Sequence, residues 1–465
     1  MDEAQAAPAD RTRAFGALRQ RLGDRFTTAA ALCAQHGRGE AYHPVHAPEA
    51  VAFVGATEEV ADVVAICAEH GVPVIAFGAG TSLEGHVAAL RGGVSLDLTQ
   101  MNRVLAVHAE DLDATVEAGV TRKQLNAHLR DTGLFFPIDP GADASLGGMA
   151  ATRASGTNAV RYGTMKEIVL GLTVVLADGR VIRTGGRARK SSAGYDLTRL
   201  FVGSEGTLGI ITEVTVRLYG VPEAMSAAVC SFPTVDAAVQ AVITTIQAGI
   251  PVARIELLDE EQMRGCIAFS RLDGYRAAPT LFYEFHGSEA GVREQAEQAL
   301  DLAREHGAQD FAWATRPEER NRLWQARHDS YYAALALRPG AVGWATDVCV
   351  PISRLGECIR ETRADVAAAG LLAPIVGHVG DGNFHLLMLL DPSRPEELAT
   401  AKELNKRLVR RAIAMGGTCT GEHGVGMGKM DSLAEEAGPA LEVMATIKRA
   451  LDPANILNPG KIVRI

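Results

Sequence analysis

Two histidines flank an Asp-Gly pair in the stretch from Gly377 to His385, which reads G-H-V-G-D-G-N-F-H. Apolar runs lie on either side, and Asp-Gly between such runs is a strong hairpin signal because both turn residues need a positive φ. A two-residue turn at Asp381-Gly382 predicts that His378 and His385 are directly opposite, with Cβ atoms about 4.5–5.5 Å apart. Two imidazoles at that spacing can bind one metal ion.

A carboxylate and a further imidazole follow downstream, at Glu422 and His423 in the stretch G-E-H-G-V-G. Glycines on both sides let the backbone bring the two side chains into one pocket. A core or surface role explains any single histidine more simply, but buried imidazoles each need a partner. The combination therefore predicts a divalent-metal site at His378, His385 and Glu422, and this donor set suits Zn²⁺ and Mn²⁺ equally.

Composition narrows the class of protein. The 465 residues, 47% apolar content and mean hydropathy of +0.05 predict an ordinary globular protein of two or three domains. A formal charge of −10 and a pI near 5.8 argue against nucleic acid as a partner. The seven cysteines form no C-x-x-C pair and are expected to be buried free thiols in a reducing compartment. No transmembrane segment or leader is expected, so we predict a cytoplasmic protein, or one peripheral at the inner face of the membrane.

A helix, a strand and a glycine-rich loop follow one another early in the chain. Helical spacing of apolar residues covers Val60–Glu69, and Pro73–Phe77 is a short apolar strand. The loop from Phe77 to Gly85 reads F-G-A-G-T-S-L-E-G, and it can present backbone N–H groups to a phosphate. It has neither the ending of a Walker loop nor the G-x-G-x-x-G spacing. By itself the loop fits a plain glycine-rich turn as well as it fits a phosphate-binding loop.

Small residues return in a long run between Pro137 and Gly163, which includes S-L-G-G-M-A-A-T-R-A-S-G at 145–156. Such a run lets the backbone approach an extended ligand closely along its length, as a dinucleotide requires. Two strands joined by an Asp178-Gly179 turn are expected next, followed by G-S-E-G-T-L-G at 203–209.

These motifs together resemble the FAD-binding domain of the vanillyl-alcohol oxidase and p-cresol methylhydroxylase (PCMH) superfamily. The resemblance rests on 78–82, 145–156 and 203–209, and it spans about residues 44–220. With the histidines and Glu422, the second half looks like the FAD-linked D-2-hydroxy-acid dehydrogenases. These include D-lactate dehydrogenase, the glycolate oxidase flavin subunit and D-2-hydroxyglutarate dehydrogenase, and G-H-V-A-A-L after Glu84 is most like the D-lactate type.

The resemblance implies an α+β chain in four parts. An N-terminal helical segment (1–43) precedes a PCMH-type FAD-binding domain of two subdomains (44–220). A ferredoxin-like α+β substrate or cap domain with the metal site (221–440) follows, and a C-terminal segment (441–465) returns to the FAD domain. Thr81 stands where some superfamily members carry a histidine bonded to the flavin, so non-covalent FAD is expected.

The resemblance also implies roles for individual residues. The W-x-x-R pattern at 324–327 implies that Arg327 holds the substrate carboxylate through two parallel bonds, although spacing alone also allows a surface helix arginine. Asn383 and His423 are the other expected substrate contacts, and His423, Arg327 and His378 form the expected catalytic set, with His423 as the base. The expected FAD contacts are Phe77, Gly78, Ala79, Gly80, Thr81, Ser82, Pro140, Gly141, Ser145, Gly147, Gly148, Thr152, Ala154, Ser155, Gly156, Tyr162, Gly163, Glu205, Gly206, Gly209, Ile210 and Ile211.

The implied reaction is oxidation of a small D-2-hydroxy acid, best matched by D-lactate, to its 2-oxo acid, with hydride transfer to flavin N5. Electrons would pass to an acceptor other than NAD: a quinone, a cytochrome or an electron-transfer flavoprotein. The residues leave glycolate, D-2-hydroxyglutarate and a flavin subunit of a multi-component oxidase open. A flavin transferase of the alkylglycerone-phosphate synthase branch is not expected to carry the H-x₆-H hairpin. The oligomeric state, a homodimer included, is also open.

Overall fold

The computed structural model describes residues 10–40, 42–272, 274–314 and 316–465. Residues 1–9 and 41, which belong to the predicted N-terminal segment, lie outside the described residues. The chain divides into two compact units, each built from segments that are not continuous in sequence. The first unit comprises the chain up to Ser155 with Gly163–Val221 and Glu422–Ile465, and the second comprises Gly156–Tyr162 and Pro222–Gly421.

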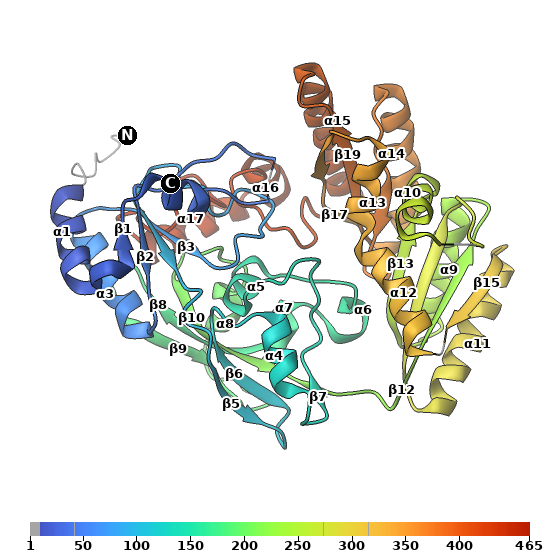
Figure 1. Cartoon of the computed structure of the whole chain (residues 1–465), viewed down its shortest axis with the longest axis horizontal. Coiled ribbons are helices and arrows are strands. Elements are labelled where there is room, and N and C mark those ends of the chain that lie inside the picture. Colours follow the sequence, from blue (N-terminus) through green and yellow to red (C-terminus); the bar gives the residue numbers. More distant parts are fainter. Residues whose placement is uncertain (1–9, 41, 273, 315) are drawn as a thin grey trace. The chain divides into compact units, whose positions relative to one another are not determined.

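Two sheets and a short strand pair make up the described β-structure of the first unit (Figure 1). A four-stranded sheet has the order β1-β2-β4-β3, and a five-stranded antiparallel sheet has the order β5-β6-β10-β8-β9, while β11 pairs with β7. The strands are β1 (Phe26–Thr27), β2 (Ala50–Phe53), β3 (Val74–Phe77), β4 (Val94–Asp97), β5 (Val104–His108), β6 (Asp113–Glu117), β7 (Leu134–Phe135), β8 (Val169–Val175), β9 (Val181–Gly185), β10 (Ile210–Arg217) and β11 (Tyr219–Gly220).

Helices accompany these sheets, and α3 packs through an apolar face that the sequence predicts. The buried face of α3 consists of valines and a cysteine at positions 60, 63, 64 and 67, the face expected from their spacing. The helices are α1 (Arg11–Leu22), α2 (Ala30–His36), α3 (Thr57–Glu69), α4 (Arg122–Leu129), α5 (Leu146–Thr152), α7 (Met165–Ile168), α8 (Leu197–Phe201), α16 (Met430–Ala437) and α17 (Ala440–Leu451), with a 3₁₀ turn at Gly23–Arg25.

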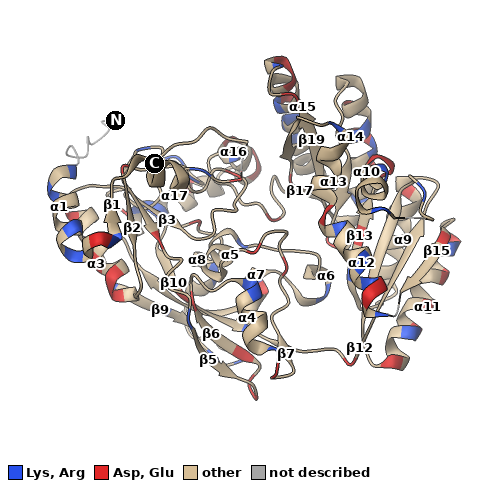
Figure 2. Ribbon diagram, in the orientation of Figure 1, with Lys and Arg blue, Asp and Glu red and all other residues tan. Residues whose placement is uncertain are grey.

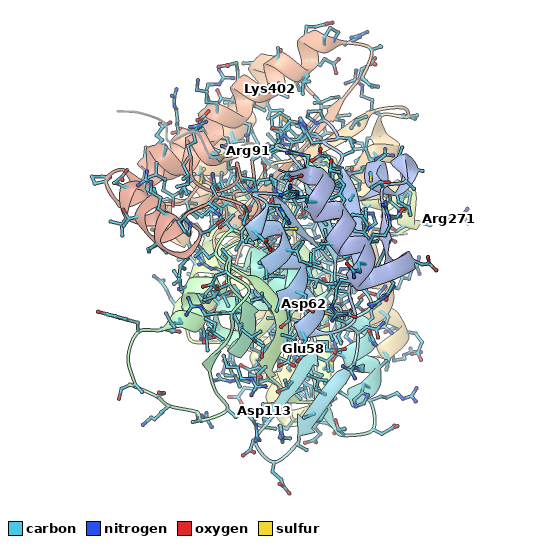
Figure 3. The ribbon with its side chains drawn as sticks, turned by 90° about the vertical axis from the view of Figure 1, so that its left-hand side faces the viewer. Glu58, Asp62, Arg91, Asp113, Arg271 and Lys402 are labelled. Carbon is cyan, nitrogen blue, oxygen red and sulfur yellow. The ribbon has the colours of Figure 1, made fainter. Side chains whose placement is uncertain are left out.

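Charged side chains lie along the helices, whereas the strands are mostly uncharged (Figure 2). On α3, Asp62, labelled in Figure 3, forms an ion pair with Arg21 of α1 at 2.7 Å. Both side chains are more than 40% exposed, 41% for Arg21 and 48% for Asp62, so water screens the pair. Exposed pairs of this kind contribute about 0–1 kcal/mol. The packed apolar face is therefore what holds α3 on its sheet.

An antiparallel sheet of eight described strands forms the second unit, with the order β15-β12-β14-β13-β18-β19-β16 and β17 beside β19. Its first four strands alternate with α9 and α11 in the ferredoxin-like order, which confirms the predicted α+β cap architecture. The strands are β12 (Ala224–Ser231), β13 (Val252–Leu258), β14 (Thr280–Gly287), β15 (Gln309–Ala314), β16 (Val342–Ala345), β17 (Val348–Cys349), β18 (Ile375–Gly377) and β19 (Asn383–Leu390).

Helices pack on this sheet and on one another. An apolar cluster joins β12, β13 and β14 to α10, α12 and α13, while α9 and α11 contact each other and the same strands. The helices are α6 (Ala159–Tyr162), α9 (Val235–Gln247), α10 (Glu260–Ser270), α11 (Glu289–Glu305), α12 (Pro317–His328), α13 (Ser330–Leu337), α14 (Leu355–Ala369) and α15 (Pro395–Ala414), with a 3₁₀ turn at Ile352–Arg354.

The two units correct the expected domain boundaries in two places. The FAD domain was expected to run unbroken from 44 to 220, but Gly156–Tyr162 belongs to the second unit. The cause is local bonding, since the Tyr162 hydroxyl lies 2.7 Å from His286 Nδ1 and Arg161 donates to the Pro251 carbonyl. The cap was expected to reach residue 440, but the second unit ends at Gly421. The backbone beyond it is bonded to the first unit at Glu205.

Two further expectations concern the chain as a whole. The seven cysteines, all at described positions, form no disulfide, and all except the half-buried Cys349 are buried. No helix in the described part of the chain is long and apolar enough to cross a membrane.

A buried lysine fastens the C-terminal segment within the first unit. Lys448 on α17 donates to the carbonyl oxygens of Thr207 at 2.7 Å and Leu457 at 2.8 Å, and it pairs with the fully buried Asp452. Asp452 in turn accepts from the backbone N–H groups of Ile456 and Leu457. Leu457 then bridges to Val74 of β3. This network returns the C-terminus to the first sheet.

Lys448→Met should lower the free energy of unfolding by about 3–5 kcal/mol, because it leaves the buried Asp452 carboxylate without its cation. Urea denaturation of the flavin-loaded protein measures this loss. The control Arg449→Met removes an exposed pair with Glu442 on the same helix and should stay within about 0.5 kcal/mol. Equal losses in the two variants would show that the buried network does not hold the segment.

Candidate functional site

The hairpin that carries the two histidines has a different register from the predicted one. Ile375 pairs with Leu386, and Val376 pairs with His385. The predicted pairing of His378 with His385 is therefore wrong by two positions. The turn takes four residues and not two, because the His378 carbonyl accepts from the backbone N–H groups of Asp381 at 3.1 Å and Asn383 at 3.3 Å.

The imidazoles still meet, because a shift of two positions keeps each side chain on its face of the sheet. His378 and His385 become diagonal neighbours, and their ring centroids are 5.4 Å apart with planes at 82°. Gly380 allows the tight turn, since a Cβ at this position would lie 2.6 Å from Ile255 Cγ2 and 2.7 Å from Val160 Cγ2.

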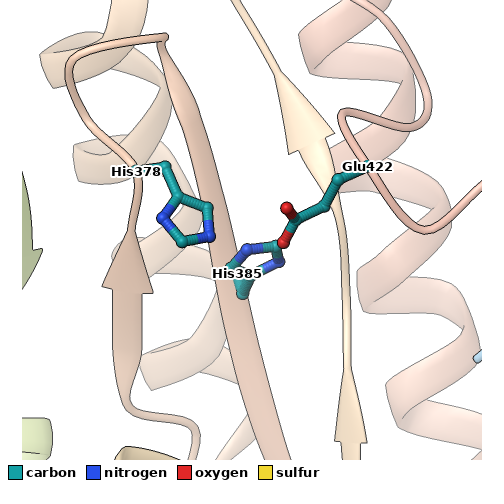
Figure 4. Close-up of side chains that lie close together, drawn as sticks. All are labelled: His378, His385 and Glu422. Atoms are coloured by element: carbon teal, nitrogen blue, oxygen red, sulfur yellow. The ribbon is translucent and has the colours of Figure 1, made fainter. Parts of the chain in front are cut away.

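The three predicted metal ligands come together in space. One ligand atom from each of His378, His385 and Glu422 lies within 4.8 Å of the others. Figure 4 shows the Glu422 carboxylate turned toward the imidazoles. Glu422 directly follows Gly421, the last residue of the second unit. The three side chains offer two nitrogens and one carboxylate oxygen, which is the donor set of a divalent-metal site with positions left for a substrate.

Hydrogen bonds select the tautomer of each histidine. Nδ1 of His378 lies 2.8 Å from Glu256 Oε1, and Nδ1 of His385 lies 2.9 Å from the Thr346 carbonyl oxygen. Both partners accept, so Nδ1 carries the proton and the neutral ring has its lone pair on Nε2. Metal-binding histidines need this arrangement, in which an acceptor on one nitrogen orients the ring and makes the other nitrogen more basic.

Asp347 supports the turn that precedes Glu422. This buried carboxylate accepts from Asn383 Nδ2 at 2.8 Å and from Thr420 Oγ1 at 2.7 Å. Asn383 also donates to the Val348 carbonyl at 2.8 Å. Both amide protons of Asn383, an expected substrate contact, are thus committed within the protein. Its side chain connects the start of β19 to the strand and turn beside it.

Arg327 is buried on α12 with 7% of its surface exposed. Its Nε and Nη2 donate to Glu256 Oε2 at 3.0 Å and 2.5 Å, and Nη1 donates to Ser330 Oγ at 3.2 Å. Three of the five N–H groups of a guanidinium are thereby used, which leaves one on each Nη among the described residues. That remaining pair can bind a carboxylate end-on, so the predicted role of Arg327 is compatible with its bonds.

Glu256 is the residue that sequence reasoning missed. It is 1% exposed and bonded to both His378 and Arg327. Burial alone would raise the pKa of this carboxyl, but the interactions with His378 and Arg327 lower it below the usual value. The available signal was an acidic residue inside the apolar strand V-A-R-I-E-L-L, where a buried charge must have partners.

In the first unit, Glu205 fixes the loop that follows His423. Its carboxylate accepts from the backbone N–H groups of Val425 at 2.7 Å and Gly426 at 2.8 Å. Glu205 was expected to contact the cofactor, and its carboxylate also holds this loop; the cofactor contact stays a prediction. His423 itself lies near the buried Glu84. Burial would raise the pKa of Glu84, but Lys429, His43 and His423 together lower it.

Buried polar atoms around Glu205 fit a polar ligand. His86 Nδ1, Ser204 Oγ and Asn458 Oδ1 have no hydrogen-bond partner within the described protein, while His86 Nε2 lies 3.3 Å from Glu205 Oε2. These residues are neighbours, because Asn458 Nδ2 donates to the carbonyl oxygens of His86 at 3.1 Å and Glu205 at 2.8 Å. Unpaired buried polar atoms are rare in a finished fold. A ligand rich in nitrogen and oxygen, such as FAD, would satisfy them.

The glycine-rich motifs also meet within this unit. Gly80 has a φ of +70°, and a Cβ at Gly78 would lie 2.4 Å from Ser145 Oγ, so the first loop touches the second motif. Other expected FAD contacts have different surroundings. Ile210 and Ile211 are buried in apolar clusters, and Gly156 and Tyr162 belong to the second unit. The third motif joins the first two, because the backbone N–H groups of Gly203 and Glu205 donate to the carbonyl oxygens of Ala150 and Ala151, each at 2.9 Å. All three glycine-rich motifs are therefore brought together.

Fold and site define a flavoprotein oxidoreductase with a PCMH-type FAD domain. Residues 48–185 match the family model "FAD binding domain", and residues 221–462 match "FAD linked oxidases, C-terminal domain". p-Cresol methylhydroxylase with substrate bound superposes with a TM-score of 0.80 at 21% identity over 97% of both chains, which shows the shared fold.

Curated relatives identify the family more narrowly. A probable mitochondrial D-lactate dehydrogenase of Danio rerio is 55% identical over 97% of this chain and 92% of its own length. A D-lactate dehydrogenase [cytochrome] of Arabidopsis thaliana is 48% identical over 92% of this chain and 76% of its own. A glycolate oxidase subunit of Bacillus subtilis is 35% identical over 89% of each. The chain belongs to the FAD-linked D-2-hydroxy-acid dehydrogenase family.

His385→Ala should remove a metal ligand and leave FAD bound, because His385 lies on β19 of the second unit and the FAD motifs lie in the first. Metal content by elemental analysis should fall while flavin absorbance stays. The control His306→Ala alters a histidine of the second unit that contacts Thr244, and it should retain both. Loss of FAD together with metal would show that the two sites form one folding unit.

Proposed function

We propose that this enzyme oxidises D-lactate, or a closely similar D-2-hydroxy acid, to the 2-oxo acid with FAD and a divalent metal. The names of the Danio and Arabidopsis relatives support the substrate. The observation that carries the metal is the convergence of His378, His385 and Glu422 within 4.8 Å. Their bonds at Nδ1 favour the tautomer that a metal requires.

The residues divide the chemistry among them. Bound FAD would supply the hydride acceptor, and a metal held by His378, His385 and Glu422 would supply Lewis acidity toward the substrate hydroxyl. Arg327 uses its two remaining N–H groups to bind the carboxylate and so fixes the position of C2. His423, as a neutral imidazole, accepts the hydroxyl proton while C2 loses its hydrogen as hydride. One proton and one hydride leave the substrate, which yields the 2-oxo acid.

An external acceptor must then take the two electrons. The Arabidopsis and Saccharomyces relatives carry the word cytochrome in their names, so we place a cytochrome before a quinone or an electron-transfer flavoprotein. Zn²⁺ or Mn²⁺ remains the expected metal. A cytoplasmic location remains a prediction from the sequence, and the oligomeric state, a homodimer included, stays open.

The Bacillus glycolate oxidase subunit favours a second candidate, glycolate. Anaerobic mixing with D-lactate, glycolate and D-2-hydroxyglutarate separates these options through the rate at which each bleaches the flavin absorbance. D-Lactate should react fastest. Absence of bleaching by any 2-hydroxy acid would assign the chain to a non-catalytic flavin subunit. The alkyldihydroxyacetonephosphate synthase structure, at 20% identity and a TM-score of 0.77, shares the fold only.

The FAD should dissociate on acid precipitation, because Thr81 stands where covalent members of the superfamily carry histidine. After acid quench and filtration the yellow colour should appear in the filtrate. Colour that remains with the precipitated protein would demonstrate a covalent bond.

His423→Asn should keep both metal and FAD, since a base adjacent to a ligand must hold its own lone pair free for the proton. Flavin reduction should slow by about 10²–10⁴-fold while D-lactate affinity stays within about tenfold. The loss should shrink as pH rises, because hydroxide partly replaces the base. Stopped-flow reduction across a pH series measures this.

The matched control is His43→Asn, which alters the other histidine beside Glu84 and should change the rate by less than about tenfold. A His423→Asn protein that has lost its metal, or that reduces flavin at the parent rate, would assign the base to another residue. The roles of Glu422 and His423 would then be exchanged.

A further inference from the structure

We propose that Glu256 is a positioning residue that couples the metal site to the substrate-carboxylate site, so that the two ligands bind cooperatively. The proposal rests on the proposed function, because it takes His378 as a metal ligand and Arg327 as the carboxylate anchor. One carboxylate serves both residues: Oε1 lies 2.8 Å from His378 Nδ1, and Oε2 accepts from Arg327 Nε and Nη2.

Strand pairing places Glu256 between these partners. In the β13–β18 ladder Leu258 pairs with Val376 and Leu257 with Gly377, so the next step brings Glu256 opposite His378. Side chains alternate along a strand, and Glu256 shares its face of β13 with Leu258. Leu258 belongs to the apolar cluster that also includes Leu323 and Trp324 of α12. Glu256 therefore faces the helix that carries Arg327.

Both partners are bonded to this one carboxylate. Arg327 forms its ion pair with Glu256, with a side-chain exposure of 8% against 1% for Glu256. Removal of Glu256 would leave a buried guanidinium uncompensated. His378 would lose the acceptor that holds its proton on Nδ1 and directs Nε2 toward the metal. A change in the position of one partner therefore changes the position of the other, because both are bonded to the same carboxylate.

The coupling has a reciprocal form that can be measured. A cation on His378 Nε2 makes Nδ1–H a stronger donor, which tightens the bond to Oε1 and fixes the orientation of the carboxylate. The same carboxylate orientation fixes the two remaining N–H groups of Arg327, which would bind a substrate carboxylate. Linkage requires that a carboxylate ligand raise metal affinity by the factor by which metal raises carboxylate affinity.

Propionate is the probe, because it carries the carboxylate of lactate and has no hydroxyl group for the metal. Mn²⁺ affinity of the FAD-loaded full chain is measured by chelator competition, with and without propionate, for the parent, Glu256→Gln and Glu284→Gln. Glu284 is the matched control, because it is also a buried glutamate that contacts a histidine and an arginine. It lies on β14, where its carboxylate is 2.9 Å from His286 and 3.5 Å from Arg254. It thus contacts a histidine and an arginine outside the site.

In the parent, propionate should raise Mn²⁺ affinity by about fivefold or more. Glu256→Gln should weaken Mn²⁺ binding by about 10–100-fold and reduce the effect of propionate to within about twofold of none. Glu284→Gln should match the parent in both measurements. A Glu256→Gln protein with parental metal affinity and parental coupling would overturn this inference and leave the proposed function standing. A parent that binds no Mn²⁺ or Zn²⁺ would overturn both.

A second variant covers the case in which Glu256→Gln does not fold. Arg327→Lys keeps a cation beside Glu256 and removes the planar fork. Arg327 is not a metal ligand, so a purely local role predicts unchanged Mn²⁺ affinity. Coupling through Glu256 predicts a loss of about fivefold with FAD content unchanged. Parental Mn²⁺ affinity in Arg327→Lys would contradict the coupling.

Discussion

Burial of charge is the constraint on which this structure depends. A carboxylate removed from water is stable only when ionic and hydrogen-bond partners replace the lost solvation. Glu256 meets that need with His378 and Arg327, and Asp347 meets it with Asn383 and Thr420. Each carboxylate thereby fixes side chains from segments far apart in sequence. The positions of His378 and His385, two of the expected metal ligands, follow from how these charges are neutralised.

The first unit uses the same physics for a different purpose. Glu205 accepts two backbone N–H groups from the loop after His423, and Lys448 joins α17 to Asp452 and two carbonyl oxygens. Both contacts tie the C-terminal stretch to sheets formed by the early part of the chain. The loop that carries the expected base is thus held by buried polar bonds within its own unit.

The antiparallel sheet of the second unit brings the side chains that make these bonds close together. Adjacent strands β13, β18 and β19 place Glu256, His378 and His385 on neighbouring positions of one surface. The helix α12 adds Arg327 from above that surface. Side chains that stand on packed strands lose few rotamers on binding a ligand, so such a site is largely organised before a metal or substrate arrives.

Local pattern was enough for much of this protein. Apolar spacing predicted α3, the family resemblance implied the ferredoxin-like cap, and residue type with spacing singled out His378, His385 and Glu422 as a donor set. The glycine-rich motifs identified the family. These properties depend on neighbours within a few residues or on a motif that the family repeats, so they can be read along the chain.

The sequence by itself determined which family the chain belongs to and singled out the residues expected to carry the chemistry. Only the tertiary structure decided the hairpin register, the place of Gly156–Tyr162 in the second unit, the structural use of Asn383 and Glu205, and the role of Glu256. The physical reason is that strand register and buried ion pairs depend on partners distant in sequence. A turn signal such as Asp381-Gly382 limits the strand register without fixing it. A lone glutamate in an apolar strand indicates that a buried charge needs partners, but the sequence does not show which residues they are.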